Sequence, residues 1–134
     1  MTYLVYGIDV GPFLKARGTF EDFRRDMKTD RDKAGAIQAF EFSFELAWKT
    51  LKRFLHVKGI EVRSPRDCFR EAAAVALISN PKQWFLFLEK RNLTVHTYEP
   101  KIVEDILKVF DAYSAALDEM IGYIEHEHTK SSSS

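Results

Sequence analysis

A short stretch, residues 91–98, brings together a guanidinium, a carboxamide, an imidazole and a phenol. These groups belong to Arg91, Asn92, His96 and Tyr98. Arginine offers a planar cation that suits phosphate, and histidine can take or give a proton near neutral pH. Since no cluster of acidic residues accompanies them, the stretch suits metal-free chemistry on a phosphodiester better than metal-dependent hydrolysis.

The spacing within this stretch sets a geometric condition. In a regular helix Asn92 and His96 would share a face, whereas Arg91 would lie about 140° from His96 at 100° per residue. A kinked helix end or the long arginine side chain is therefore needed for Arg91 and His96 to converge. Structural roles remain open as well, because Asn92 suits a helix end and Tyr98 can pack with its hydroxyl satisfied.

A second group of candidate residues lies on an earlier helical pattern. Glu41, Glu45, Lys49 and Lys52 follow one another at three- and four-residue steps beside Trp48. One interpretation is an exposed ladder of ion pairs, which stabilises a helix only slightly. The other is a groove between helices, in which Glu45 fixes an arginine or holds a basic group of a partner.

Arg66 and Arg70 form a third group. They stand four residues apart in an expected helix, so their guanidiniums would share a face and could clamp phosphates. Pairing with the neighbouring acids Asp67 or Glu71 is the alternative, and the sequence leaves both interpretations open.

Helical periodicity dominates the elements that must position these groups. Apolar residues recur at three- and four-residue steps in five segments, residues 12–28, 30–58, 64–78, 82–90 and 100–124. Gly59 fits a left-handed helix end, and Asn80-Pro81 divides the third helix into two pieces. No strand alternation is convincing after residue 12. We therefore predict an all-α, four-helix up-and-down bundle with one split helix. The long second helix favours an elongated bundle or a homodimer.

Composition limits the class of protein. With 20 basic and 20 acidic residues the net charge is zero, so no strongly basic face for long nucleic acid is evident, although a local positive groove remains open. The single cysteine, Cys68, allows no internal disulfide, which fits the cytoplasm. No apolar run approaches the roughly 20 residues of a membrane span. Four histidines without paired cysteines make zinc unexpected, and we expect neither a metal nor a cofactor.

The two ends of the chain differ from its middle. Residues 1–11 fit either a short extended arm or a helix interrupted by Gly7 and Gly11. Residues 12–126 hold the helical patterns. Residues 127–134 are mostly polar and are expected to be flexible. The chain is therefore expected to consist of an N-terminal arm, a helical bundle and a polar tail.

Three motifs occur in order along the chain. They are Phe40-Glu41-Phe42-Ser43-Phe44-Glu45-Leu46-Ala47-Trp48-Lys49-Thr50-Leu51, Ser64-Pro65-Arg66-Asp67 followed by Arg70-Glu71-Ala72, and the Arg-x4-His-x-Tyr run from Arg91 to Tyr98. Together they resemble the nucleotidyltransferase substrate-binding protein family of the HEPN superfamily, over roughly residues 12–125. The resemblance implies a helical bundle, usually dimeric, that acts beside a separate minimal nucleotidyltransferase. Gly11 and Gly18 are unusual for the first helix of that family.

The resemblance also implies a chemistry for residues 91–98. In many HEPN proteins the Arg-x4-His motif is a metal-independent RNase site, and the protein and its transferase form a toxin–antitoxin pair. Carried over, Arg91 would stabilise the phosphorane and His96 would act as acid and base at a ribose 2′-hydroxyl, with Asn92 completing the site. Tyr98 would receive AMP from the partner, which silences the toxin.

Three functional hypotheses follow. The first is a dimeric, metal-independent RNase regulated by AMP transfer to Tyr98. The second is a non-catalytic subunit that presents a substrate or nucleotide to the transferase, with a groove lined by Glu41, Glu45, Trp48, Lys49, Arg66 and Arg70. The third is a purely structural dimeric module. The expected partners are therefore a separate nucleotidyltransferase, RNA or a nucleotide, and a second copy, with no membrane.

Overall fold

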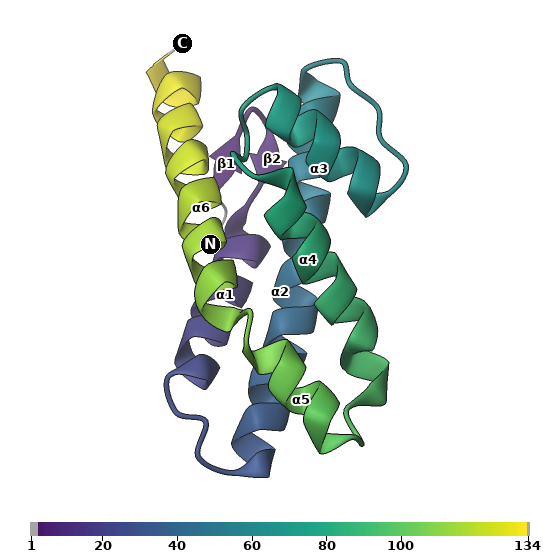
Figure 1. The fold of residues 1–134 in the computed structure, drawn as a ribbon. Helices are drawn as coiled ribbons and strands as arrows, with labels where there is room; N and C mark the ends of the chain where they lie inside the picture. The colour runs from purple at the N-terminus through teal and green to yellow at the C-terminus, as the bar shows by residue number, and fades with distance from the viewer. Residues whose placement is uncertain (1–2, 134) are drawn as a thin grey trace.

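The computed structural model describes residues 3–133, which form an almost wholly helical bundle (Figure 1). The helices are α1 (Gly11–Arg24), α2 (Asp30–Val57), α3 (Pro65–Ala74), α4 (Pro81–Asn92), α5 (Pro100–Leu107) and α6 (Phe110–Ser133). A 3₁₀ turn, η1 (Leu93–His96), joins α4 to the segment before α5, and two short strands, β1 (Leu4–Val5) and β2 (Ile8–Asp9), precede α1. The all-α helical bundle predicted from the sequence is confirmed.

Local signals fix most of the helix ends. Thr29 caps α2 by accepting a 3.0 Å hydrogen bond from the Asp32 N–H, and the Asp32 carboxylate accepts one in return from the Thr29 N–H. Gly59 follows α2 with a φ of +82°, a left-handed conformation that glycine adopts without strain. Ser64 and Asn80 cap α3 and α4 through their side chains. The central helix, α2, therefore begins and ends within one residue of the bounds that the sequence predicts.

The end of α3 differs from the sequence prediction. The helix ends at Ala74 instead of near residue 78, because Ala76 adopts a φ of 64° and reverses the chain. The Leu77 N–H then donates to the Ala72 carbonyl at 2.8 Å, which completes the capping turn. Glycine usually fills such a position, so an alanine there gives no signal in the sequence.

The C-terminal part of the chain also departs from the prediction. The segment expected to be one helix over residues 100–124 is divided into α5 and α6, although no glycine or proline marks the break at residues 108–109. Residues 127–134 were expected to form a flexible tail, and in the structure α6 continues to Ser133. The bundle therefore contains a second divided helix besides the one at Asn80-Pro81 (Figure 1).

The N-terminal segment is a hairpin, which is the extended of the two predicted alternatives. Leu4 pairs with Asp9 and Val5 with Ile8, and the two turn residues between the strands have positive φ. Val5 is fully buried, so the hairpin contributes to the core. Figure 1 shows the hairpin lying between α6 and the end of α2. The first two residues of the predicted arm lie outside the described residues.

The centre of the core is an aromatic cluster around Tyr113 of α6. The centroid of its ring lies 5.0 Å from that of Phe20 on α1, 4.8 Å from Phe40 on α2 and 5.2 Å from Phe87 on α4. These edge-to-face contacts are favourable beyond the apolar area that they bury. The Tyr113 hydroxyl shares a 2.7 Å hydrogen bond with Ser43 Oγ on α2. One buried side chain therefore fixes α6 and α4 relative to α2.

This hydrogen bond can be tested by unfolding. Tyr113→Phe should lower the free energy of unfolding by about 1–2 kcal/mol, because it removes a buried hydrogen bond and keeps the ring. Ser43→Ala should cost about 1–3 kcal/mol, since it leaves the buried tyrosine hydroxyl without its partner. The double variant should lose less than the sum of the two. Urea unfolding followed by tryptophan fluorescence measures all three, and strictly additive losses would contradict the coupling.

Candidate functional site

A carboxylate on α2 organises the first part of the candidate site, the Glu45 cluster, which consists of Glu45, Trp48, Lys49 and Arg91. Oε1 of Glu45 lies 3.2 Å from Nε of Arg91. Oε2 accepts a 3.2 Å hydrogen bond from the Trp48 indole N–H and lies 4.0 Å from Nζ of Lys49. Glu45 thereby holds an arginine, as one of the two sequence interpretations expected, and the arginine is the one at the end of α4.

The ion pair between Glu45 and Arg91 orients more than it stabilises. Side-chain exposure is 35% for Glu45 and 32% for Arg91, so water screens the attraction and its net contribution to stability is small. Nε of Arg91 is buried, and within residues 3–133 it forms no aligned hydrogen bond. The Glu45 carboxylate is therefore the contact that fixes the direction of the Arg91 side chain at the surface of α2.

The second part of the site is the pair His96 and Tyr98, just beyond α4. The turn η1 is anchored by Thr94, whose Oγ1 donates a 2.7 Å hydrogen bond to the Arg91 carbonyl. His96 ends η1, and its Nδ1 lies 3.2 Å from the Tyr98 hydroxyl. Both side chains are exposed, Tyr98 to 74%. The imidazole is thus accessible to a substrate while one of its nitrogens is engaged by the phenol.

The structure divides the predicted catalytic residues between these two groups. Arg91 belongs to the Glu45 cluster, whereas His96 contacts Tyr98. Within the described chain, no hydrogen bond or ion pair links the two groups, and the exposed Asn92 side chain bonds to neither. Arg91 and His96 are therefore close along the chain but held by different partners.

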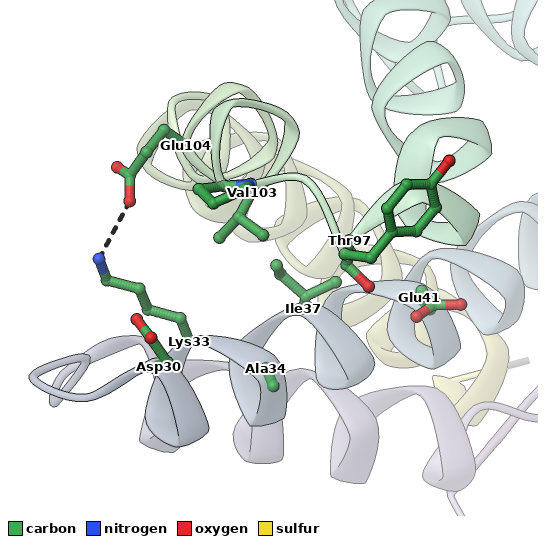
Figure 2. Close-up of a pocket in the computed structure, with 10 residues that line it drawn as sticks. Asp30, Lys33, Ala34, Ile37, Glu41, Thr97, Val103 and Glu104 are labelled. Carbon is green, nitrogen blue, oxygen red and sulfur yellow. Dashed lines mark hydrogen bonds and ion pairs between the residues drawn. The ribbon is translucent and has the colours of Figure 1, made fainter.

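A pocket of about 330 Å³ adjoins Tyr98 between α2 and α5 (Figure 2). Its lining residues are Asp30, Lys33, Ala34, Ile37, Glu41, Thr97, Tyr98, Pro100, Val103 and Glu104. Lys33 on α2 forms a 3.0 Å ion pair with Glu104 on α5, which Figure 2 shows at one end of the pocket. Glu41 lies in this pocket and not in the Glu45 cluster. Sequence reasoning missed Asp30 and Lys33, although their three- and four-residue steps to Ile37 and Glu41 place them on one face of α2.

Arg66 and Arg70 occupy a different surface. Their guanidinium carbons lie 5.2 Å and 5.6 Å from the centre of the Phe85 ring, on the first turns of α4. Arg70 also lies 3.4 Å from the Asp67 carboxylate, which is one of the acids that the sequence offered as a partner. Both arginines therefore bind α3 to α4 through cation–π contacts, and their role in a substrate groove stays a prediction.

Three observations concern other kinds of site within the part of the chain that the structure describes. No three His, Cys, Asp or Glu side chains among residues 3–133 lie together so as to hold a metal ion. No helix in that range has both the length and the apolar character to span a membrane. Cys68 is buried, and burial raises the pKa of its thiol to about 12, so it is not a reactive thiolate at neutral pH.

Comparison with known proteins assigns the chain to a family. The family model described as nucleotidyltransferase substrate binding protein like matches residues 13–125. The chain belongs to this family. The resemblance drawn from three sequence motifs is thereby confirmed, and the matched region contains both the Glu45 cluster and the His96–Tyr98 pair.

Solved structures share the fold of this family member. A protein from Thermus thermophilus is 28% identical with a TM-score of 0.79, and the match covers 84% of this chain and 98% of that one. A protein from Haemophilus influenzae is 25% identical with a TM-score of 0.78, over 87% and 99% of the two chains. Its structure is said to reveal the fold of a substrate binding domain of a nucleotidyltransferase.

A curated relative carries a more specific name. Probable ribonuclease HepT of Haemophilus influenzae is 36% identical in an alignment of 83 residues, and the match covers 58% of this chain and 57% of that protein. The chain therefore spans a little over half the length of this relative.

The orienting role of Glu45 can be measured in solution. Glu45→Gln keeps an acceptor for Trp48 but removes the charge that faces Arg91. We expect the Arg91 Nε–H to exchange with water severalfold faster in this variant, because the side chain leaves the surface of α2 more often. Proton–nitrogen NMR of the arginine side chains measures the rate. Asp67→Asn is the matched control and should change only Arg70, whereas an unchanged Arg91 rate in Glu45→Gln would contradict the role of Glu45.

Proposed function

We propose that the protein is a metal-independent endoribonuclease of the HEPN type, the toxin of a toxin–antitoxin pair with a separate minimal nucleotidyltransferase. The observation that carries this proposal is the arrangement around η1. A guanidinium held by Glu45 precedes the turn, and an exposed imidazole, His96, ends it. The name of the relative, probable ribonuclease HepT, supports the same chemistry. The cytoplasm supplies both RNA and the ATP that the partner uses.

The proposed reaction uses the 2′-hydroxyl of RNA as its nucleophile. Nε2 of His96 takes the proton of this hydroxyl, because Nδ1 is engaged by Tyr98, and the 2′-oxygen bonds to the adjacent phosphorus. Arg91 stabilises the negative charge of the phosphorane, and the Asn92 amide donates to the phosphate. The bond from phosphorus to the 5′-oxygen then breaks. Water protonates the leaving oxygen and recovers a proton from the imidazolium, which leaves a 2′,3′-cyclic phosphate.

A homodimer completes this site in the proposal. Arg91 and His96 have different partners within one chain, so we place the cut phosphodiester in a cleft between the η1 turns of two copies. Exposed apolar side chains on α2, α4 and η1 support such contact. Phe42 on α2 and Leu86 on α4 are each 39% exposed, and Val95 in η1 is 70% exposed. A second copy would cover these side chains.

Tyr98 is the proposed regulatory site. Tyr98 is 74% exposed and lines the pocket between α2 and α5, where a partner transferase can reach it. The Tyr98 oxygen attacks the α-phosphorus of ATP and its proton passes to solvent. The bond from this phosphorus to the pyrophosphate oxygen breaks, so AMP becomes attached and pyrophosphate leaves. In this proposal the Nδ1–H of His96 donates to the Tyr98 oxygen, which leaves Nε2 free as the base. After modification that oxygen is part of a phosphate ester and is a weaker acceptor, and a bulky anion then stands beside the imidazole. The substrate phosphate is thereby excluded.

A non-catalytic binding subunit is the second candidate function. The family description and the pocket of about 330 Å³ favour it, since this volume lies at the small end of the range for ligand pockets. In this case the protein presents a small substrate to the transferase. Of the six residues predicted for its groove, Glu41 lines this pocket. Contacts of a substrate with Glu45, Trp48, Lys49, Arg66 and Arg70, which lie on other surfaces, stay a prediction.

Cleavage of RNA without metal separates the two functions. Purified protein in EDTA should cut bulk tRNA and leave 2′,3′-cyclic phosphate ends. His96→Ala should lower the rate about 10²–10⁴-fold, since it removes the acid and base. Lys15→Ala, on the exposed face of α1, should leave the rate unchanged. Equal cleavage by His96→Ala would contradict the proposal, and intact RNA with every protein would favour the binding subunit.

Modification of Tyr98 is tested with the partner transferase and ATP. Mass spectrometry should find one AMP on the wild type and none on Tyr98→Phe, because the variant lacks the phenolic oxygen. Tyr98→Phe should therefore keep its RNase activity after the incubation, whereas the wild type loses it. Tyr6→Phe, which removes another exposed phenol, is the control and should be modified normally. AMP found on Tyr98→Phe would assign the modification to a different residue.

A further inference from the structure

A second groove lies at the other end of α2 from the pocket beside Tyr98. Its volume is about 570 Å³, and it lies between the C-terminal part of α2 and the turn of the N-terminal hairpin. We call it the hairpin groove. Its lining residues are Tyr6, Gly7, Ile8, Trp48, Lys49, Lys52, Arg53, His56, Val57 and Glu61.

The hairpin groove concentrates positive charge in a chain whose net charge is zero. Lys49, Lys52 and Arg53 line it beside a single acid, Glu61. Among residues 3–133, neither Lys52 nor Arg53 forms an ion pair, and Nζ of Lys52 lies 6.0 Å from the centre of the Trp48 ring. Both cations are therefore available to an anionic ligand, and charge complementarity favours phosphates.

The hairpin turn brings an aromatic ring to this groove. Tyr6 has a φ of 51°, a left-handed conformation that aromatic residues seldom adopt and that Asn or Gly usually fills in a two-residue hairpin turn. Its hydroxyl donates a 2.8 Å hydrogen bond to the Glu127 carboxylate on α6, and 43% of the residue remains exposed. A strained residue that is held in place while its ring stays accessible suggests a role in binding.

The groove is continuous with the candidate catalytic site. Trp48 and Lys49 line the groove and also belong to the Glu45 cluster, which holds Arg91. From Glu45 to the last groove residues of α2 the helix rises about 17 Å at 1.5 Å per residue. A single strand bound at the catalytic site can therefore follow α2 toward the hairpin within a few nucleotides.

The hairpin stands outside the region that matches the family. The family model begins at residue 13, whereas β1 and β2 end at Asp9. One wall of the groove is thus formed by residues of this chain that precede the matched region.

We propose that the hairpin groove binds a single-stranded segment of RNA next to the phosphodiester cut at Arg91 and His96. Lys52 and Arg53 contact phosphates of the strand, and a base stacks on the ring of Tyr6. Cationic grooves with accessible aromatic rings bind single strands in this way, largely without regard to sequence. The proposal rests on the proposed RNase function for the identity of its ligand.

Binding is measured apart from cleavage with a strand that cannot be cut. A fluorescein-labelled RNA methylated at every 2′-oxygen is titrated with the full chain and followed by fluorescence anisotropy. Lys52→Glu/Arg53→Glu should raise the Kd at least about tenfold and reduce the slope of log K against log salt by about 1.4, for two lost phosphate contacts. Lys15→Glu on α1 is a charge-reversal control away from the groove and should bind as the wild type does.

Stacking on the hairpin is tested with two further variants. Tyr6→Leu should raise the Kd about tenfold, because the aromatic ring is lost. Tyr6→Phe keeps the ring without the hydrogen bond to Glu127 and should bind within about twofold of the wild type. Equal affinity of Tyr6→Leu and Tyr6→Phe would overturn the stacking contact, and equal affinity of Lys52→Glu/Arg53→Glu and Lys15→Glu would overturn the groove.

The two proposals fail in distinguishable ways. Groove-dependent binding together with no cleavage of unmodified RNA in EDTA would reject the RNase function and retain the RNA groove. Metal-free cleavage, together with a Kd that no groove substitution changes, would retain the RNase function and reject the RNA groove. Absence of binding by the wild type would reject the groove as well.

Discussion

Tyr113 lies where rings from α1, α2 and α4 meet, and its hydroxyl reaches Ser43 inside the same core. Because a ring of this size packs in few orientations, it sets how α4 lies against α2. The position of α4 in turn determines which side chains of α2 Arg91, near the end of α4, can contact. For this reason Arg91 contacts the Glu45 carboxylate on α2, whereas His96 at the end of η1 and Tyr98 just after it are exposed. The positions of the candidate-site side chains thus depend on the packing of the buried aromatic core around Tyr113.

The two faces of α2 have different roles. The inner face supplies buried aromatic side chains to the core, and the outer face runs from the pocket beside Tyr98, past Glu45, to the hairpin groove. Glu45 is the electrostatic centre of this outer face, since it contacts Lys49, Trp48 and Arg91 together. The partly exposed ion pairs of Glu45 contribute little to stability. Its role is therefore better explained as positioning Arg91 and Lys49 than as stabilising the fold.

The helices could be predicted from the sequence because their signals are local. Asn80 caps α4, and Gly59 reverses the chain after α2. The end of α3 could not be predicted, since Ala76 takes a conformation that alanine rarely adopts, and neither could the break between α5 and α6, where the apolar periodicity continues. The residue types of the candidate site were evident in the sequence. Their division into an Arg91 group and a His96 group was not, because contacts between helices depend on packing that periodicity does not encode.

The nucleophile of the proposed reaction is tested most directly by removing it from the substrate. An RNA and the same sequence methylated at every 2′-oxygen are incubated with the protein in EDTA, and the ends of the products are analysed. The proposed chemistry predicts that only the unmodified RNA is cut, and that its products carry 2′,3′-cyclic phosphate and 5′-hydroxyl ends. Cleavage of the methylated strand, or products with 5′-phosphate ends, would show that water is the nucleophile and would contradict the roles given to Arg91 and His96.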